Sequence, residues 1–237
     1  RMLQSLEQDI ADAVMNTTTW TGSELTTDID AGTSPMSGSK WTVKASADPF
    51  ADIDYAREKV KTNSGMTPNT VVMTDTDFIN CIRTDRVEGL LKYDAMQVYM
   101  AMQGQQNAQV IQAATSGLAA LFNVDQIIIG QGFKNTANDG LAASFGRFWP
   151  VGRVMVCHVS VDGMSGDLET PYPCIGRTIF STKNGEPLPG SDDAGYGSLI
   201  FDEYREEQAR GSVFRPRNKR QVKILHPEAG HLLTNAY

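Results

Sequence analysis

The stretch DPFADIDYAREKVKTNSGMTPNTVVMTDTDF, residues 48–78, decides the fold, because its pattern predicts a helix, a turn and a buried strand. Asp48 is a good N-cap, and Pro49 suits the first helical position, where no backbone N–H is needed. Gly65 is placed to end the helix. The apolar run at residues 70–73 is typical of a buried strand. This unit contains no phosphate loop, nucleophile elbow or metal-ligand spacing.

The segments around this unit predict further helices and strands. An apolar stripe with helical period opens the chain, and a long polar, turn-rich loop at residues 17–47 follows, anchored by Trp20 and Trp41. The run VDQIIIG predicts a buried strand at residues 124–130. Other expected elements are a short helix at residues 117–122, capped by Thr115 or Ser116, and strands at residues 151–159, 171–180, 199–204, 221–226 and 230–236.

The composition is that of a globular protein with an acidic balance. The chain has 237 residues, of which 41% are hydrophobic, enough for one large domain or two small ones. A formal net charge of −7 argues against a protein whose main task is to grip nucleic acid. The charge is compatible with a wall that faces packed nucleic acid without sticking to it, and equally with simple solubility.

The cysteines and the hydropathy bear on where the protein is made. Cys81, Cys157 and Cys174 are odd in number and far apart, which suggests reduced thiols and synthesis in a cytoplasm. No run is apolar and long enough to span a membrane, and no signal peptide is visible. We therefore expect no membrane partner.

Residues with catalytic or metal-binding chemistry do not form a recognisable set. Cys157 and His158 are adjacent on an expected strand, so their side chains would point to opposite faces. His226 and His231 lack the spacing and the third ligand of a metal site. The Asp192-Asp193 pair lacks the further oxygen ligands of a calcium loop. We therefore predict no catalytic, cofactor-binding or metal-binding residues, and no cofactor.

Several blocks carry a specific order of residues. DPFADID and GMTPNT, in the unit at residues 48–78, are followed by LAALF, VDQIIIG and the turn NTANDG at residues 135–140. PYPCIGRTIF then occupies residues 171–180, the run YREE begins at Tyr204, and PEAGHL precedes the end of the chain. Taken in this order, the blocks resemble the major capsid proteins of tailed phages, the lambda-type head protein family. The resemblance runs from about Trp41 to the end.

The resemblance implies an α+β subunit with the phage major capsid fold. A spine helix and a peripheral lobe would accompany an axial lobe of mixed sheet and helices. The peripheral lobe would comprise residues 1–47, with the spine helix and a loop, and residues 205–237, with the closing strands. The axial lobe would comprise residues 48–204. An arm and an extended loop precede the spine helix in this family, so we expect residues upstream of Arg1.

The function that the resemblance implies is physical, that of a structural major capsid protein and not of an enzyme. Copies would self-assemble into hexamers and pentamers that close an icosahedral shell around double-stranded DNA, which they would contact non-specifically. Scaffold, portal and decoration proteins are the other expected partners. The protein would be made in the host cell cytoplasm and would end in the capsid of the virion.

Two groups of residues are candidates for contacts between subunits. The first shares the apolar stripe of the opening helix: Leu3, Leu6 and Ile10. The second carries charge and lies in YREE and in RPRNKR: Arg205, Glu206, Glu207, Arg215, Arg217 and Arg220. We interpret RPRNKR, residues 215–220, as a compact basic loop, for which simple solvation is the alternative to a contact.

Two alternative functions remain open. The shell subunit of a cellular nanocompartment, similar to encapsulins, would have the same fold. A hydrolase would use the cysteine or histidine residues.

Overall fold

The computed structural model describes residues 2–15, 19–32, 35–91, 108–135, 137, 142–160, 174–180, 200–206, 211–217 and 220–237. The described helices are α1 (Met2–Val14), α2 (Pro49–Ser64), α3 (Asp75–Ile82), α4 (Asp85–Leu91) and α6 (Ala108–Leu121), with short 3-10 turns η1 (Ile29–Ala31) and η3 (Pro227–Ala229). The described strands are β1 (Thr26–Asp28), β2 (Thr70–Thr74), β3 (Gln126–Gly130), β4 (Phe133–Asn135), β5 (Phe145–Arg147), β6 (Val154–Cys157), β7 (Gly176–Phe180), β8 (Ile200–Glu206), β9 (Gly211–Arg217), β10 (Arg220–Ile224) and β11 (Gly230–Thr234).

The unit at residues 48–78 folds as its pattern predicts, into α2, β2 and the start of α3. Asp48 caps α2, because its Oδ1 accepts hydrogen bonds from the backbone N–H groups of Phe50 and Ala51 at 3.2 and 3.3 Å. Gly65 ends the helix with a φ of 71°, a left-handed conformation that glycine adopts without strain.

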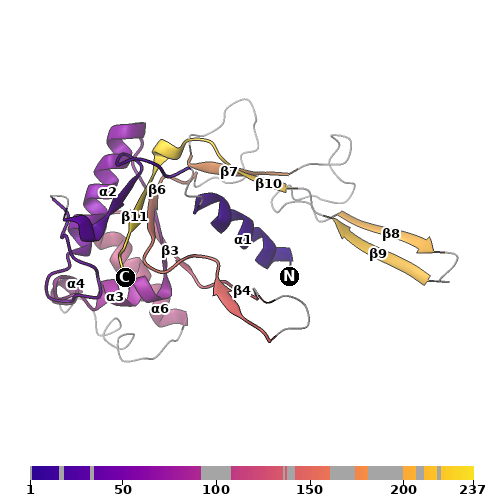
Figure 1. Ribbon diagram of the computed structural model, residues 1–237, viewed down its shortest axis with the longest axis horizontal. Coiled ribbons are helices and arrows are strands. Elements are labelled where there is room, and N and C mark those ends of the chain that lie inside the picture. The colour runs from indigo at the N-terminus through magenta and orange to yellow at the C-terminus, as the bar shows by residue number, and fades with distance from the viewer. Residues whose placement is uncertain are drawn as a thin grey trace.

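A five-stranded mixed sheet with the order β1-β11-β6-β2-β3 forms the centre of the protein. β2 is parallel to β3 and β1 is parallel to β11, while β6 is antiparallel to both of its neighbours. Figure 1 shows α2, α3 and α6 on one side of this sheet and α1 on the other. A mixed sheet with helices that do not alternate regularly with strands confirms the predicted α+β class.

Alternation along the central strands gives the sheet two different faces. In β6, Val154 and Val156 belong to the core that α2, α3 and α6 cover. Met155 and Cys157 point the other way and join a second, smaller core that includes Ala11 of α1. The expectation that neighbouring side chains of this strand point to opposite faces is therefore confirmed.

The loop that precedes α2 is fastened by the two tryptophans that the sequence singles out. Trp20 lies in the second core and Trp41 in the first, and both side chains are buried. The Trp41 indole N–H donates to Oδ2 of Asp52 at 2.8 Å, and the Ser37 backbone N–H donates to Oδ1 at 2.9 Å. Burial raises the pKa of Asp52, so these hydrogen bonds are what keep its charged form in the core.

Among the described strands, three antiparallel pairs lie outside the main sheet: β4–β5, β7–β10 and β8–β9. Figure 1 shows the β8–β9 pair extending from the body as a ribbon. The division of the chain at residues 47 and 204 into peripheral and axial lobes stays a prediction. The main sheet itself combines β1 and β11 with β6, β2 and β3, and these strands come from all three of the segments so assigned.

The interpretation of RPRNKR, residues 215–220, as a compact loop is wrong. Arg215 and Arg217 lie in β9, and Arg220 begins β10. Pro216 is tolerated within β9 because a two-stranded ribbon has free edges, where a residue without an N–H loses no ladder hydrogen bond.

Two further predictions need correction. The strand in VDQIIIG is an edge strand and not a fully buried one: its exposed residues include Ile128, which is 44% exposed. No described strand pairs with the other side of β3. The helix before it begins at Ala108, well ahead of Thr115 and Ser116, because the alanines and glutamines in between favour a helix.

His231 in β11 is fully buried as a neutral imidazole. Its Nδ1 lies 3.0 Å from the backbone oxygen of Glu24, so Nδ1 carries the proton and donates. Its Nε2 then accepts from the Thr27 hydroxyl, 3.0 Å away. The Tyr55 ring packs edge-on against the imidazole, with ring centroids 6.1 Å apart. Burial lowers the pKa of His231 to about 4, so acid favours the unfolded chain, which binds the proton more readily.

We predict that His231 makes the protein sensitive to acid. Its contribution to stability is complete above about pH 6.5 and is lost as the pH falls toward 4. A pKa change of this size corresponds to about 3 kcal/mol. The difference in the free energy of unfolding between the wild type and His231→Gln, from urea denaturation, should therefore shrink by about 3 kcal/mol between pH 7 and pH 4. A difference that stays constant over this range would contradict the neutral, buried imidazole.

We also predict that the Trp41–Asp52 hydrogen bond couples the loop to α2. Trp41→Phe removes the indole N–H and leaves a smaller ring, and should lower the free energy of unfolding by at least about 1–3 kcal/mol, since a buried carboxylate loses a partner and the core loses volume. A double-mutant cycle with Asp52→Ala isolates the interaction. Strictly additive effects of the two substitutions in urea denaturation would show that this bond contributes nothing.

Candidate functional site

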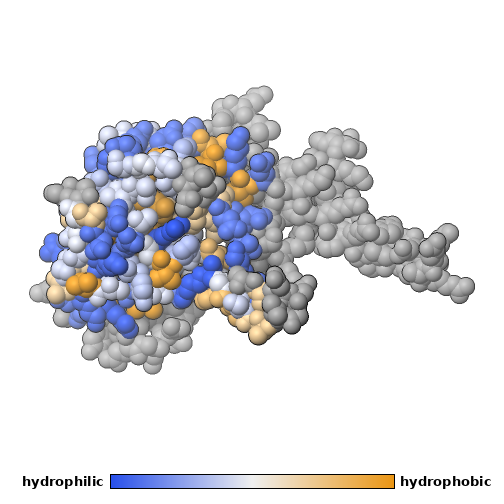
Figure 2. Space-filling view, viewed as in Figure 1, coloured by the Kyte–Doolittle hydropathy of each residue, from blue (hydrophilic) through white to orange (hydrophobic). Residues whose placement is uncertain are grey.

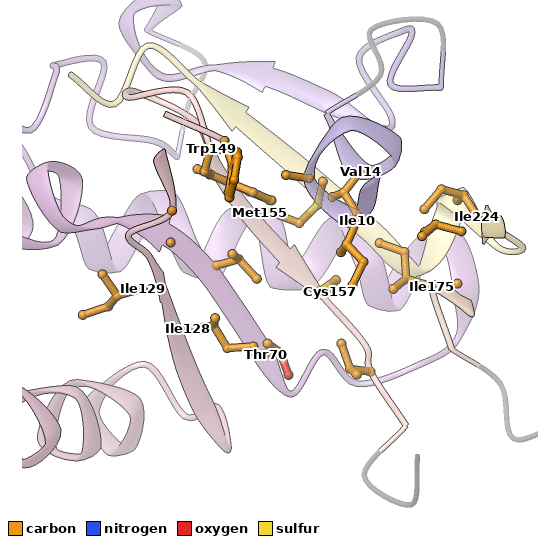
Figure 3. A pocket seen from close by; sticks show the side chains of 18 of the residues that line it. Ile10, Val14, Thr70, Ile128, Ile129, Trp149, Met155, Cys157, Ile175 and Ile224 are labelled. Carbon is orange, nitrogen blue, oxygen red and sulfur yellow. The ribbon is translucent and has the colours of Figure 1, made fainter. Parts of the chain in front are cut away.

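An apolar groove of approximately 790 Å³ lies between α1 and the second face of the main sheet. Its wall is built from α1, the central strands and β10, and Figure 3 shows these side chains converging from different elements. The apolar residues that line it include Ile10, Val14, Val72, Ile128, Met155 and Ile224.

Within the part of the chain that the structure describes, α1 covers only part of this face, and the groove lies beside it. Ile10 on α1 is 38% exposed and Ile128 on β3 is 44% exposed, although both line the groove. In Figure 3 Ile128 and Ile129 point to opposite sides of β3, as strand alternation requires. Ile127 and Ile129 pack against the first core, which leaves Ile128 on the groove side. Apolar surface of this kind is more favourable when water is excluded from it.

Glycine shapes one wall of the groove. A Cβ atom at Gly132, just after β3, would overlap the ring of Phe148. The Phe148 N–H donates to the Gly132 carbonyl at 2.9 Å, which holds the two backbones together. The absent side chain therefore lets Phe148 and Trp149 pack beside β3, and both rings line the groove.

The rest of the visible surface differs from the groove. Figure 2 shows hydrophilic residues over most of the described surface on the face in view, with apolar residues in small clusters between them.

One exposed ion pair joins α1 to β4, with Asp12 Oδ1 and Lys134 Nζ 4.0 Å apart. An exposed pair of this kind adds little stability, so α1 is held mainly by the packing of its apolar side chains and by the Trp20 indole N–H, which donates to the Val14 carbonyl.

The structure separates the two predicted groups of contact residues. Leu3, Leu6 and Ile10 all lie on α1, and Ile10 is the member placed at the groove. The charged group lies on other strands. Arg205 and Glu206 are in β8, Arg215 and Arg217 are in β9, Arg220 is in β10, and Glu207 lies outside the described residues. Asp202 is the register partner of Arg215 across the ribbon.

The residues of the sheet that line the groove were missed as candidates. Val72 and Met155 lie in runs that read simply as buried strands, and Ile128 reads the same way. The sequence did contain a signal: apolar residues at alternate positions of an expected strand share one face, and the short opening helix was the expected element that could cover that face. That combination needs the pairing of distant strands, which local patterns do not contain.

The residues with reactive side chains do not come together in one site. Cys157 lines the groove and His158 points elsewhere, with its Nδ1 2.7 Å from the Thr67 carbonyl. Burial raises the pKa of Cys157 to about 12, which disfavours a nucleophilic thiolate. Among the described residues, no cluster of His, Cys, Asp or Glu has the arrangement of a metal site. No helix in the described ranges is long and apolar enough to cross a membrane.

Comparison with known proteins concerns the fold. The chain is similar to the crystal structure of a phage-related protein from Bordetella bronchiseptica RB50, with a TM-score of 0.68 and 18% sequence identity. The match covers 99% of this chain and 64% of that one, so this chain spans less than two thirds of the length of that protein. No protein-family model matches the sequence, and a search of curated proteins finds no match. The chain therefore has the fold of that phage-related protein over nearly its whole length.

Proposed function

We propose that this protein is a structural subunit of a phage head, of the major capsid type. The observation that carries the proposal is the fold shared with a phage-related protein over 99% of the chain, at a TM-score of 0.68. The ordered blocks that resemble tailed-phage capsid proteins support the same assignment, because their described parts are spread along this fold, from DPFADID in α2 and LAALF in α6 to PEAGHL at η3 and β11.

The apolar groove supports a function in which copies contact one another. Each copy carries a formal net charge of −7, so copies repel at long range. Contacts between them must then rely on apolar surface or on opposite charges brought close together. Ile10 and Ile128 supply half-exposed apolar surface on two sides of one groove. The groove is therefore a candidate surface for a neighbouring subunit.

In this proposal the protein acts by assembling and has no catalytic role. Contacts that join different surfaces of successive copies close into rings when the rotation between them is right, and hexamers and pentamers are such rings. The rings would close a shell around double-stranded DNA. An acidic wall contacts DNA weakly and without sequence preference, since DNA is itself polyanionic. Scaffold, portal and decoration proteins are the partners that such a shell takes, and the virion is where it ends.

We predict that a charge placed in the groove prevents assembly. In the full-length protein, Ile10→Asp and Ile128→Asp should shift the population from large assemblies to free subunits in sedimentation velocity. Each would bury an unpaired carboxylate at a contact, at a cost of about 3–5 kcal/mol, or roughly a hundredfold or more in the association constant.

Val43→Asp is the matched control, because Val43 is 51% exposed, lies outside the groove and receives the same charge. It should assemble like the wild type, and circular dichroism should show all three variants folded. Normal assembly of both groove variants would exclude the groove as a contact. A wild-type protein that remains a free subunit at every concentration would refute the shell proposal itself.

A further inference from the structure

The two ends of the main sheet are protected differently. β1, at one end, is only three residues long and runs into η1. It also carries Asp28, whose carboxylate accepts from the Asp30 N–H and the Asn235 side chain. Short edge strands and charged residues are devices that stop a sheet from pairing with another chain. This end of the sheet therefore carries two features that disfavour pairing with a further strand.

β3, at the other end, has none of these devices. Its sequence is QIIIG, with neither lysine nor proline, and it is five residues long. It pairs with β2 along its whole length, and no described strand pairs with its other side. Ile128 at its centre is 44% exposed. An open, apolar edge of this length is a ready template for a strand from another chain.

The β8–β9 ribbon is the complementary feature. Its strands are seven residues each and are paired in register from Ile200 opposite Arg217 to Glu206 opposite Gly211. Among the described strands, each of the two pairs with the other alone. A lone two-stranded hairpin is marginally stable in water and becomes stable when a third strand or a packing surface is added. The outer edge of β9 includes Pro216, which has no N–H to donate, so β8, which has no proline and is seven residues long, is the ribbon edge that can pair with β3.

The ribbon does not reach β3 of its own chain. Figure 1 shows it extending away from the body that contains β3. A ribbon at one place and an open edge at another are different surfaces, so pairing between copies is head-to-tail. Head-to-tail contacts build rings when they close, and fibres when they do not.

We propose that the β8–β9 ribbon of one copy adds to the β3 edge of the next copy and extends its main sheet. The proposal rests on the shell function proposed above and names the segment that makes one of its contacts. An added strand would lie about 4.8 Å beyond β3, beside Ile128, and would border the open side of the groove. This pairing would also bring Arg205, Arg215 and Arg217 of the ribbon to a boundary between copies.

Cross-linking between singly substituted proteins tests the pairing. One preparation of the full-length protein carries Ile128→Cys and an affinity tag; a second, untagged preparation carries Tyr204→Cys or Val213→Cys, which are register partners on the two ribbon strands. The native cysteines Cys81, Cys157 and Cys174 are buried, so they contribute little background. A short bismaleimide tolerates a shift in register, since directly opposite residues of paired strands have Cβ atoms about 5 Å apart.

Mixing the two preparations should give a cross-linked dimer of tagged and untagged chains, and tagged Val43→Cys should give none with either ribbon variant. Absence of the mixed dimer, or a dominant dimer between two Ile128→Cys chains, would overturn the proposal. Sedimentation of the same samples distinguishes a failure of the ribbon contact from a failure of the shell function. Closed shells without the mixed dimer would overturn the ribbon contact alone, whereas the mixed dimer in open fibres would support the ribbon contact and refute the shell.

Discussion

The structure depends on the strict alternation of side chains along the two central strands, β2 and β6. In β2, Val71 and Met73 enter the core under α2, α3 and α6, while Val72 faces α1. This alternation obliges the protein to cover both faces of its sheet. Among the described elements, α2, α3 and α6 cover one face, and α1 with parts of neighbouring loops covers the other. The incompletely covered face is the reason that the groove exists, and so the reason that apolar side chains such as Ile128 stay partly exposed there.

Buried carboxylates hold two loops against the helices through hydrogen bonds. Asp77 is fully buried and accepts hydrogen bonds from the Gly152 N–H, with oxygens 2.9 and 3.0 Å away, and from the Thr74 hydroxyl at 2.7 Å. Burial raises the pKa of Asp77, so these donors stabilise a charge that the core would otherwise exclude. Asp77 joins α3 to the turn before β6, much as Asp52 joins α2 to its loop. Loops fixed in this way would lose little conformational entropy if the proposed association between copies takes place.

The sequence predicts the local parts of this fold well and the distant pairings poorly. Caps at Asp48 and Gly65 act within one helix, so the unit at residues 48–78 is readable from its own residues. The edge position of β3 cannot be predicted from its own residues, because the same three isoleucines would suit the middle of a sheet. The contact between β1 and β11 joins residues about two hundred positions apart, and only the folded chain shows it. The groove combines such pairings, so Ile10 could be singled out and Ile128 could not.

Electron microscopy of the purified full-length protein tests the central claim most directly. The account predicts closed, uniform particles whose surface resolves into rings of five and six subunits, with α1 and the edge of β3 at boundaries between copies. Discrete monomers or small two-fold oligomers, seen across a wide range of protein and salt concentrations, would contradict the account.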